Sequence, residues 1–271
     1  MEGSLRHDKI NFKKKFDLSG RTIIIIGGLG LIGKSFCDVV AQYGGNVVVV
    51  DKNHKGMTAH LKYLRKYNIN CEGYSIDISK KKEIKSLLNE VLLEFKNVDG
   101  LVNAHHVKPD GFFESFEDYD EHTLTKILEV NLKGTILSCQ IIGSWMALNN
   151  GGSIVNMPST YSIVAPNQNL YEGNKMGSPA VYSASKGGIR ALTKYLAVYW
   201  SKNGVRVNDI TPHGVWDNHE ATFEKKFNDL SPMGRMSFNH EVASGLIYLL
   251  SDASSYVTGH NLVIDGGWTV W

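Results

Sequence analysis

The chain has 271 residues, of which 42% are hydrophobic and 21% charged, enough for one large α/β domain or two small ones and unlike a disordered chain. Its 29 Lys and Arg nearly balance 27 Asp and Glu, which gives no general electrostatic case for nucleic acid or an anionic membrane as the main partner. The 3 cysteines stand apart without metal-ligand spacing, so they support neither a disulfide framework nor a zinc site and predict a reducing, cytoplasmic location.

The N-terminal segment lacks the apolar core of a signal peptide, and the chain lacks an apolar stretch long enough to span a membrane. Residues 1–17 hold charges throughout, and no uninterrupted apolar stretch reaches the roughly 18 residues that a membrane span needs. We therefore expect a basic tail over residues 1–17, one domain over residues 18–271, and no membrane segment.

The hydrophobic pattern then alternates between strands and helices along the chain. In order it predicts a strand at 22–26, a helix at about 31–43, a strand at 46–51, a strand ending at Asp77, a helix at 79–96, a strand at 98–103, a long helix at 120–148, a strand at 153–157, a helix at 179–202, a strand at 205–210, a helix at 240–250 and a strand at 261–264. Such alternation needs crossover connections, which make the strands parallel and place helices on both faces. The predicted fold class is α/β: a Rossmann-type, doubly wound parallel sheet of about seven strands in three α/β/α layers.

A glycine-rich turn lies between the first strand and the first helix. It reads Gly27-Gly28-Leu29-Gly30-Leu31-Ile32-Gly33, and such glycines let backbone N–H groups approach a dinucleotide pyrophosphate at the positive end of a helix. Asp51 ends the next strand, where a carboxylate accepts hydrogen bonds from ribose hydroxyls and repels a 2′-phosphate. The pattern predicts NAD rather than NADP, although Lys34 and Lys52 are cations that could accommodate the phosphate. Asp77 is either an adenine contact or a cap of the following helix.

The chemistry is predicted at Tyr182-Ser183-Ala184-Ser185-Lys186. Tyr182 and Lys186 are four residues apart on a predicted helix and so share one face. An ammonium beside a phenol favours tyrosinate, so we expect a lowered Tyr182 pKa and a general acid/base at this position.

The ordered motifs identify a resemblance to the short-chain dehydrogenase/reductase superfamily, of the short single-domain type, over about residues 18–268. They are the glycine turn, Asp51, Asp77, Asp99–Asn103, Val130–Gly134, Gly152–Asn156, Tyr182–Lys186, Val205–Asn208 and Tyr256–Trp268. A weaker resemblance is to oxidoreductases of flagellin modification and surface-sugar biosynthesis.

The resemblance implies a catalytic tetrad. Tyr182 would exchange a proton with the substrate, Lys186 would hold the nicotinamide ribose, Ser159 would bond the reacting oxygen, and Asn131 would bind a water linking Lys186 to solvent. Asn also has a poor propensity for the middle of a helix, which independently suggests a role at this position.

The turn and the resemblance together give the full set of predicted contacts. The predicted cofactor contacts are Gly27, Leu29, Gly30, Leu31, Ile32, Gly33, Asp51, Lys52, Asp77, Ile78, Asn103, Ala104, Tyr182, Lys186, Pro212, Gly214 and Val215. The predicted substrate contacts are Ser159, His105, Lys175, Tyr182 and His213. No metal is expected, and the resemblance implies a homodimer or homotetramer, with the long helices and the Gly266–Trp268 segment at interfaces.

Several positions depart from the pattern that the superfamily shows. The glycine spacing is that of the extended members, and the usual Asn-Asn-Ala-Gly is Asn103-Ala104-His105-His106. Pro158 precedes Ser159 in place of a serine, and the usual Pro-Gly is Pro212-His213-Gly214. The glycine spacing leaves the short type as the prediction, because the remaining motifs belong to short members and only about 60 residues follow Pro212. The other changes concern the rim of the site and put substrate specificity in question.

The segment from Ser159 to Tyr182 is long and rich in amides, which suits a hydroxylated ligand. Around it the sequence could gather His105, His106, Lys108, His213, His219 and Arg235. We expect an oxidoreductase that transfers hydride between nicotinamide and a secondary alcohol or ketone of a polar, sugar-like substrate, phosphorylated or nucleotide-linked. The alternatives are a sugar epimerase or dehydratase that regenerates bound NAD, and a dinucleotide-binding protein without catalysis.

Overall fold

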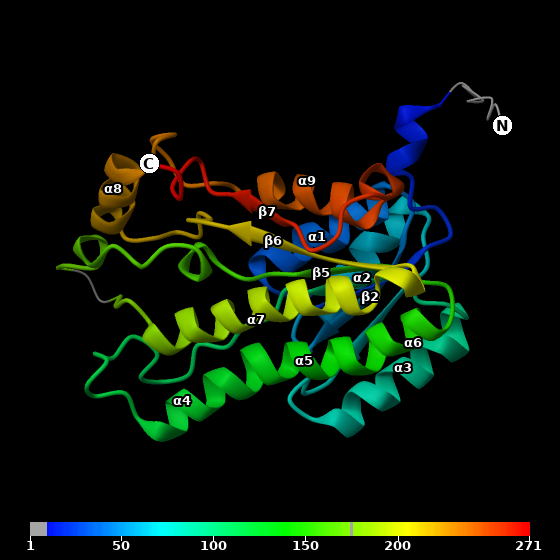
Figure 1. Cartoon of the computed structure of the whole chain (residues 1–271), viewed down its shortest axis with the longest axis horizontal. Helices are drawn as coiled ribbons and strands as arrows, with labels where there is room; N and C mark the ends of the chain where they lie inside the picture. The colour runs from blue at the N-terminus through cyan, green and yellow to red at the C-terminus, as the bar shows by residue number, and fades with distance from the viewer. Residues whose placement is uncertain (1–9, 174–175) are drawn as a thin grey trace.

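The computed structural model describes residues 10–173 and 176–271, and its centre is a seven-stranded sheet in the order β3-β2-β1-β4-β5-β6-β7 (Figure 1). Every neighbouring pair of strands is parallel. The strands are β1 (Thr22–Ile26), β2 (Asn46–Asp51), β3 (Cys71–Ser75), β4 (Gly100–Asn103), β5 (Gly152–Asn156), β6 (Val205–Pro212) and β7 (Asn261–Ile264). The strand order reverses between β1 and β4, which is where ligands bind in open sheets of this type.

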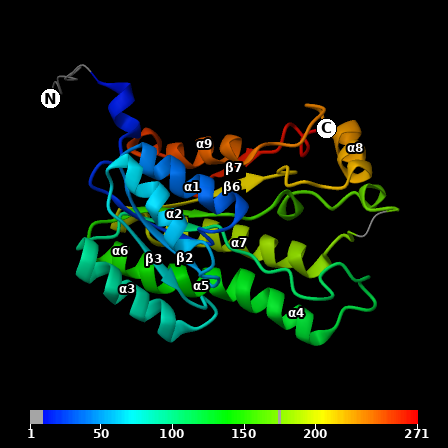
Figure 2. The same cartoon turned by 180° about the vertical axis from the view of Figure 1, so that it is seen from behind.

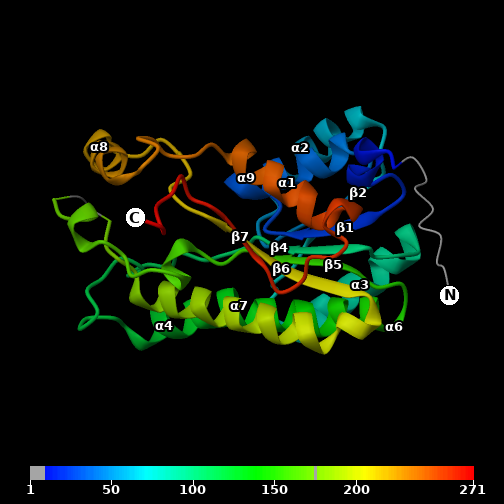
Figure 3. The ribbon, with the colours of Figure 1, turned by 45° about the horizontal axis from the view of Figure 1, so that its top comes forward.

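Helices cover both faces of the sheet (Figures 1 and 2). One face carries α1 (Leu31–Gln42), α2 (Met57–Leu64) and α9 (Asn239–Leu250). The other carries α3 (Lys81–Phe95), α7 (Ala180–Tyr199) and a long helix made of α4 (Glu121–Ile127), α5 (Gly134–Ser138) and α6 (Ser144–Leu148). The remaining helix, α8 (Ala221–Leu230), lies beyond the carboxyl ends of the strands, near the C-terminus of the chain (Figure 3).

The first two strands show why the sheet is covered on both faces. All five residues of β1 are buried, and so are the four valines of β2. Successive side chains of a strand point to opposite faces, so Ile23 and Ile25 join one core and Ile24 and Ile26 the other. Each such burial contributes about 1.5–3 kcal/mol relative to exposure.

The predicted sheet and fold class are confirmed, and the differences concern element ends and short helices. The residue Asp77 lies two positions beyond the end of β3 rather than at its last residue. The helices α2 and α8 were not predicted, because neither gives a long apolar period. The expected helix at 120–148 is interrupted by two π-helical turns, Leu128–Lys133 and Cys139–Gly143.

The beginning of the described chain is a short 3₁₀ helix over Phe12–Phe16, whose first N–H groups donate to the side chain of Asn11. It contacts the turn at Asp252–Ser254. Residues 1–9 lie outside the described part, so the division into a tail over 1–17 and one domain over 18–271 stays a prediction.

A chain of buried polar side chains crosses the middle of the sheet. Ser138 donates to Asn103 (2.7 Å), Asn103 to Asn156 (2.8 Å), Asn156 to Thr193 (2.8 Å) and Thr193 to the carboxylate of Asp209 (2.6 Å). These side chains come from α5, β4, β5, α7 and β6 in turn. Each of them satisfies the next, which is how buried polar groups avoid the cost of desolvation.

Candidate active site

A cavity of about 840 Å³ runs along the carboxyl ends of the strands, from Asp51 at one end to Tyr182 at the other. Its floor is the turn after β1, and its walls come from the segments after β4, β5 and β6. The cavity therefore lies at the point where the strand order reverses, as the fold requires of a dinucleotide site.

The glycine turn builds the middle of the cavity. Gly27 has a φ of +82°, and a Cβ on Gly33 would lie 2.0 Å from the carbonyl oxygen of Gly27. Only glycine permits this conformation and this close approach. Since α1 begins at Leu31 directly after the turn, its first N–H groups are available to a phosphate. The turn thus fits a dinucleotide pyrophosphate.

At the far end of the cavity, Asp51 is oriented by the backbone. One of its oxygens accepts from Leu29 N–H (3.1 Å) and the other from Asn53 N–H (3.0 Å). Asp77 is held by Lys52 Nζ (2.8 Å) and by Ser79, whose N–H and hydroxyl both donate to it. Burial opposes the charge, but these hydrogen bonds keep the pKa of Asp77 well below its usual value. Asp77 therefore lines the cavity and also caps the segment that begins at Ser79, so its position is compatible with both predicted roles, adenine contact and helix cap.

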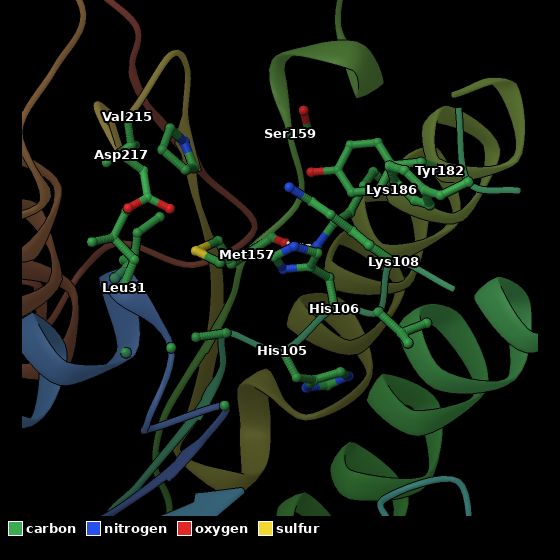
Figure 4. A pocket seen from close by; sticks show the side chains of 18 of the residues that line it. Leu31, His105, His106, Lys108, Met157, Ser159, Tyr182, Lys186, Val215 and Asp217 are labelled. Atoms are coloured by element: carbon green, nitrogen blue, oxygen red, sulfur yellow. Dashed lines mark hydrogen bonds between the residues drawn. The ribbon is translucent and has the colours of Figure 1, made fainter. Parts of the chain in front are cut away.

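The opposite end holds the predicted catalytic pair. Tyr182 and Lys186 both project from α7 into the cavity, where Ser159 faces the Tyr182 hydroxyl (Figure 4). Lys186 is 1% exposed, and its Nζ donates to the carbonyl of Met157 at 2.7 Å. The same Nζ lies 5.5 Å from the centroid of the Tyr182 ring.

The expected lowering of the Tyr182 pKa is wrong for this structure. Burial raises the Tyr182 pKa to about 12, although a hydrogen bond with Ser159 acts in the opposite direction. Lys186 does not offset the burial, because its ammonium is bonded to Met157 and burial lowers its own pKa to about 7, against the attraction of Asp209. A further positive charge in the cavity is needed to favour tyrosinate.

Asn131 lies in the first π turn of the long helix and is 0% exposed. Its side-chain oxygen accepts from Val107 N–H (3.0 Å), and its amide donates to the Ser185 hydroxyl (3.3 Å). It does not line the cavity and instead joins the segment after β4 to α7. Its water-binding role stays a prediction.

Most of the predicted contacts line the cavity. Of the predicted cofactor contacts, only Asn103 does not, because its side chain is buried in the polar chain across the sheet. Among the predicted substrate contacts, Ser159, Tyr182 and His213 line the cavity, and Lys175 lies outside the described residues. His105 reaches the wall, but its ring turns toward the long helix, where Nε2 lies 3.3 Å from the Thr135 hydroxyl.

His213 is built into the substrate end of the cavity. Its Nδ1 lies 2.6 Å from the Thr160 hydroxyl, and its ring packs 4.4 Å from that of Trp268 and 5.1 Å from that of Phe227. Burial lowers its pKa to about 4, so the imidazole is neutral. Trp268 is 9% exposed within its own chain, and the expected place of the Gly266–Trp268 segment at a subunit interface stays a prediction.

The aromatic wall around this end of the cavity was not predicted from the sequence. It consists of Phe112, Phe113, Tyr161, Tyr171, Phe223 and Phe227. These residues come from the segments after β4 and β5 and from α8, none of which has a long apolar period in the sequence. Tyr161 and Tyr171 are hydrogen-bonded to each other through their hydroxyls, so two turns of the long segment after β5 are joined.

Cationic and imidazole groups also face the substrate end. His106 is surrounded by protein yet exposed to the cavity, where its ring meets that of Tyr182 edge to face at 6.3 Å. Lys108 and His219 also line the cavity, as does Asp217, whose carboxylate lies beside Val215 and Leu31 (Figure 4). Burial, with Lys186 and Lys108 nearby, lowers the pKa of His106 to about 3. The expected contribution of Arg235 is wrong, because its guanidinium is bonded to both oxygens of Glu241 outside the cavity.

Within the described ranges, no helix is both long and apolar enough to cross a bilayer. In the same part of the chain, all three cysteines are buried and unpaired.

The chain was compared with known proteins. The family model described as enoyl-(acyl carrier protein) reductase matches residues 30–269. The NAD-dependent glycerol dehydrogenase of Listeria innocua is 32% identical, over 96% of this chain and 98% of its own. The D-threitol dehydrogenase of Mycolicibacterium smegmatis is 33% identical, over 94% of this chain and 95% of its own. The expected similarity to flagellin modification is confirmed by a Campylobacter coli protein, post-translational flagellin modification protein A, at 28% identity over 93% of this chain and 99% of its own.

Among solved structures, a gluconate 5-dehydrogenase from Burkholderia cenocepacia in complex with NADP and tartrate superposes with a TM-score of 0.85. It is 24% identical and covers 95% of this chain and 98% of its own, a similarity that shows the fold. The family match, the two relatives above 30% identity and the Tyr182 and Lys186 geometry agree with one another. The chain belongs to the short-chain dehydrogenase/reductase family and is an oxidoreductase that acts on CH–OH groups with NAD(P).

Proposed function

We propose that this enzyme transfers hydride between NAD and a secondary alcohol or ketone of a polar, sugar-like substrate. The observation that carries the proposal is the single cavity that joins a dinucleotide cradle to Tyr182, Ser159 and Lys186. When bound, the oxidised nicotinamide would accept the hydride and bring a positive charge beside Tyr182.

The residues of this chain would manage the proton. Tyr182, as tyrosinate, would take the proton of the substrate alcohol during oxidation, and its hydroxyl would return the proton to the substrate oxygen during reduction. The Ser159 hydroxyl, which already bonds Tyr182, would hold the same substrate oxygen. Lys186 would bond the ribose and, together with the positive charge of the oxidised nicotinamide, would stabilise tyrosinate. Asn131 would hold the water that connects Lys186 with solvent. The aromatic wall would keep bulk water from this end of the cavity.

The choice of NAD over NADP rests on Asp51. Two backbone N–H groups point its carboxylate along the cavity edge, where the charge of a 2′-phosphate would be repelled. Lys52 supports this choice because it is paired with Asp77 at 2.8 Å. Lys34 and Lys55 line the same end and favour NADP. The glycerol dehydrogenase relative is NAD-dependent, whereas the gluconate dehydrogenase was crystallised with NADP.

The substrate class rests on the other end of the cavity. Aromatic faces suit the C–H faces of a sugar, and the His106, Lys108 and His219 side chains suit hydroxyl or phosphate oxygens. The glycerol and threitol dehydrogenase relatives act on small polyols. We propose a polyol or sugar, with phosphorylated and nucleotide-linked forms as the narrower candidates.

A turnover screen tests the proposal. The enzyme with NAD or NADP would be offered neutral polyols, sugar phosphates, nucleotide sugars and apolar alcohols, with NADH formation followed by absorbance. We expect turnover with hydroxylated substrates. A clear preference for apolar alcohols would refute the substrate class, and product formation without net NADH would favour an epimerase or dehydratase.

We also propose a homodimer or homotetramer in the cytoplasm. Large apolar side chains are exposed along the long helix and α7, which lie side by side (Figure 1). They are Leu124, Ile136, Leu148, Tyr195, Val198 and Tyr199. A second copy of the chain is the occupant that the resemblance implies. Light scattering after gel filtration tests this, and Tyr195→Lys should shift the mass toward the monomer.

A further inference from the structure

His105 stands where the family pattern has a small residue, and its surroundings give it a defined partner. The Thr135 hydroxyl donates to the carbonyl of Asn131 at 2.7 Å. The His105 Nε2 lies 3.3 Å from the same hydroxyl, so the ring must donate through Nε2 to the oxygen. Nδ1 then carries the lone pair, and within the described residues it has no partner.

The partner of His105 is an interrupted part of a helix. In a regular α-helix the Gly134 N–H would donate to the carbonyl of Val130, but here it donates to that of Glu129. The carbonyl of Val130 thereby loses its usual donor. The His105 ring lies beside this stretch of the helix, where the backbone at Val130 and Asn131 acts to raise its pKa, although burial lowers the pKa overall. The ring is thus linked to the π turn through the Thr135 hydroxyl, which itself donates to the carbonyl of Asn131.

The helix makes room for this ring. A Cβ on Gly134 would lie 3.4 Å from His105 Nε2 and 2.6 Å from the side chain of Ile78. On the other side, a Cβ on Gly27 would lie 2.9 Å from the His105 backbone. His105 is therefore wedged between the glycine turn and the long helix, 9% exposed.

The π turn leads directly to the catalytic helix. Asn131 donates to the Ser185 hydroxyl at 3.3 Å, and that hydroxyl donates to the carbonyl of Tyr182 at 2.7 Å. Asn131 also accepts from Val107 N–H, two residues beyond His105. A displacement of the π turn would thus be transmitted to α7, where Tyr182 and Lys186 project into the cavity.

We propose that His105 is a positioning residue, which fixes the π turn through Nε2–H and so holds Asn131, Ser185 and α7 in the geometry that proton transfer at Tyr182 needs. His105 therefore does not serve as the substrate contact that the sequence suggested. This proposal rests on the function proposed above, because it assumes that Tyr182 handles the proton.

Three substitutions separate the two nitrogens of the ring. His105→Gln keeps a donor near the position of Nε2, His105→Asn keeps a polar atom near Nδ1 only, and His105→Ala keeps neither. We expect His105→Ala and His105→Asn to lower kcat about 10- to 100-fold, the scale of a displacement near 1 Å in an active site, with the cofactor KM changed less than about twofold. His105→Gln should keep kcat within about threefold of the wild type.

Thr135→Val tests the partner. Because Thr135 and His105 act on the same turn, the double variant His105→Ala/Thr135→Val should be no slower than His105→Ala alone. The matched control is Thr123→Val on the same helix, where a buried hydroxyl donates to the carbonyl of Asp110 at 2.9 Å, remote from the π turn. It should lower stability without lowering kcat.

The outcomes are distinct from those for the proposed function. A normal kcat in His105→Ala, equal losses in His105→Gln and His105→Ala, or the same kcat loss in Thr123→Val would overturn the positioning role. If Tyr182→Phe retained full activity, the proposed function itself would fail, whatever the His105 variants did.

Discussion

The two ends of the cavity differ in how closely they follow the family pattern. The cofactor end is built by β1, β2 and the glycine turn, where glycines and Asp51 meet backbone N–H groups. The substrate end is built by the segments after β4, β5 and β6, where His106 and His213 depart from the family pattern and an aromatic wall lines the cavity. The first end is specified by backbone geometry and the second by side chains, so the second can change its ligand while the fold stays the same.

The largest expected effect is at the boundary of the two ends. Tyr182→Phe and Lys186→Ala should each lower kcat by about 100- to 10,000-fold, because each removes a group that handles the proton. The measurement is steady-state NADH formation, with cofactor binding followed by fluorescence titration. Tyr195→Phe, an exposed tyrosine of the same helix, is the matched control and should keep full activity. Near-normal turnover of Tyr182→Phe would remove the basis of the mechanism.

A second change tests the cofactor end alone. Asp51→Ser should improve the ratio of kcat/KM for NADP to that for NAD on the order of 100-fold, since it removes a charge that repels a 2′-phosphate. The ratio for substrates of different kinds should not move. An unchanged cofactor ratio would show that Asp51 does not face the ribose, and a changed substrate preference would show that the two ends are not independent.

Acid should destabilise the substrate end through its buried histidines. Burial lowers the pKa of His105 to about 3 and that of His213 to about 4, from 6.5. Below pH 6.5 the unfolded chain binds the proton and the folded chain does not, so the free energy of unfolding falls with falling pH, by about 1.4 kcal/mol per pH unit for each group. This loss continues until the pH reaches the folded pKa.

His213→Gln should remove the contribution of one histidine to the pH dependence of the free energy of unfolding. Urea unfolding between about pH 4.5 and 6 would measure it, and the variant should lose about 1.4 kcal/mol per pH unit less than the wild type. His54→Gln, an exposed histidine near the cofactor end, should leave the slope unchanged. Parallel slopes for His213→Gln and the wild type would contradict a neutral buried imidazole.

The smallest expected effect concerns the charge at the substrate end. Lys108→Gln should raise KM for a phosphorylated substrate by about 2- to 10-fold, an effect weakened by salt, and leave KM for a neutral polyol unchanged. Lys80→Gln, an exposed lysine away from the cavity, is the control. An equal effect on neutral and phosphorylated substrates would argue against an anionic group beside Lys108.

The sequence predicted the frame of the molecule well, because its signals are local. Four isoleucines in succession, a glycine turn and a tyrosine four residues before a lysine each imply a structure within a few residues. Asn103 was misplaced because its role depends on Ser138 and Asn156, which only the packed sheet brings to it. The direction of the Tyr182 pKa shift was predicted wrongly, because burial raises this pKa and burial cannot be read from the sequence. The neighbouring Lys186 also donates its hydrogen bond to the Met157 carbonyl and not to Tyr182.

The substrate end was less predictable for the same reason. The aromatic wall joins Phe112, Tyr171 and Phe227 from segments far apart in sequence. The His105 ring points toward the Thr135 hydroxyl beside a π turn, and the sequence pattern does not predict that turn. Arg235 was expected in the cavity because a cation there would suit a polar substrate. In the structure its guanidinium is instead paired with the Glu241 carboxylate.

The polar chain from Ser138 to Asp209 has a consequence for anyone who redesigns this protein. Because each member donates a hydrogen bond to the next, a single apolar replacement would leave a buried neighbour without that partner, at a cost of about 1–3 kcal/mol. Swapping the whole row together for well-packed aliphatic side chains would carry no such penalty. The polar residues at the centre of this sheet should therefore be replaced together, because replacing them one at a time would produce unstable variants along the way.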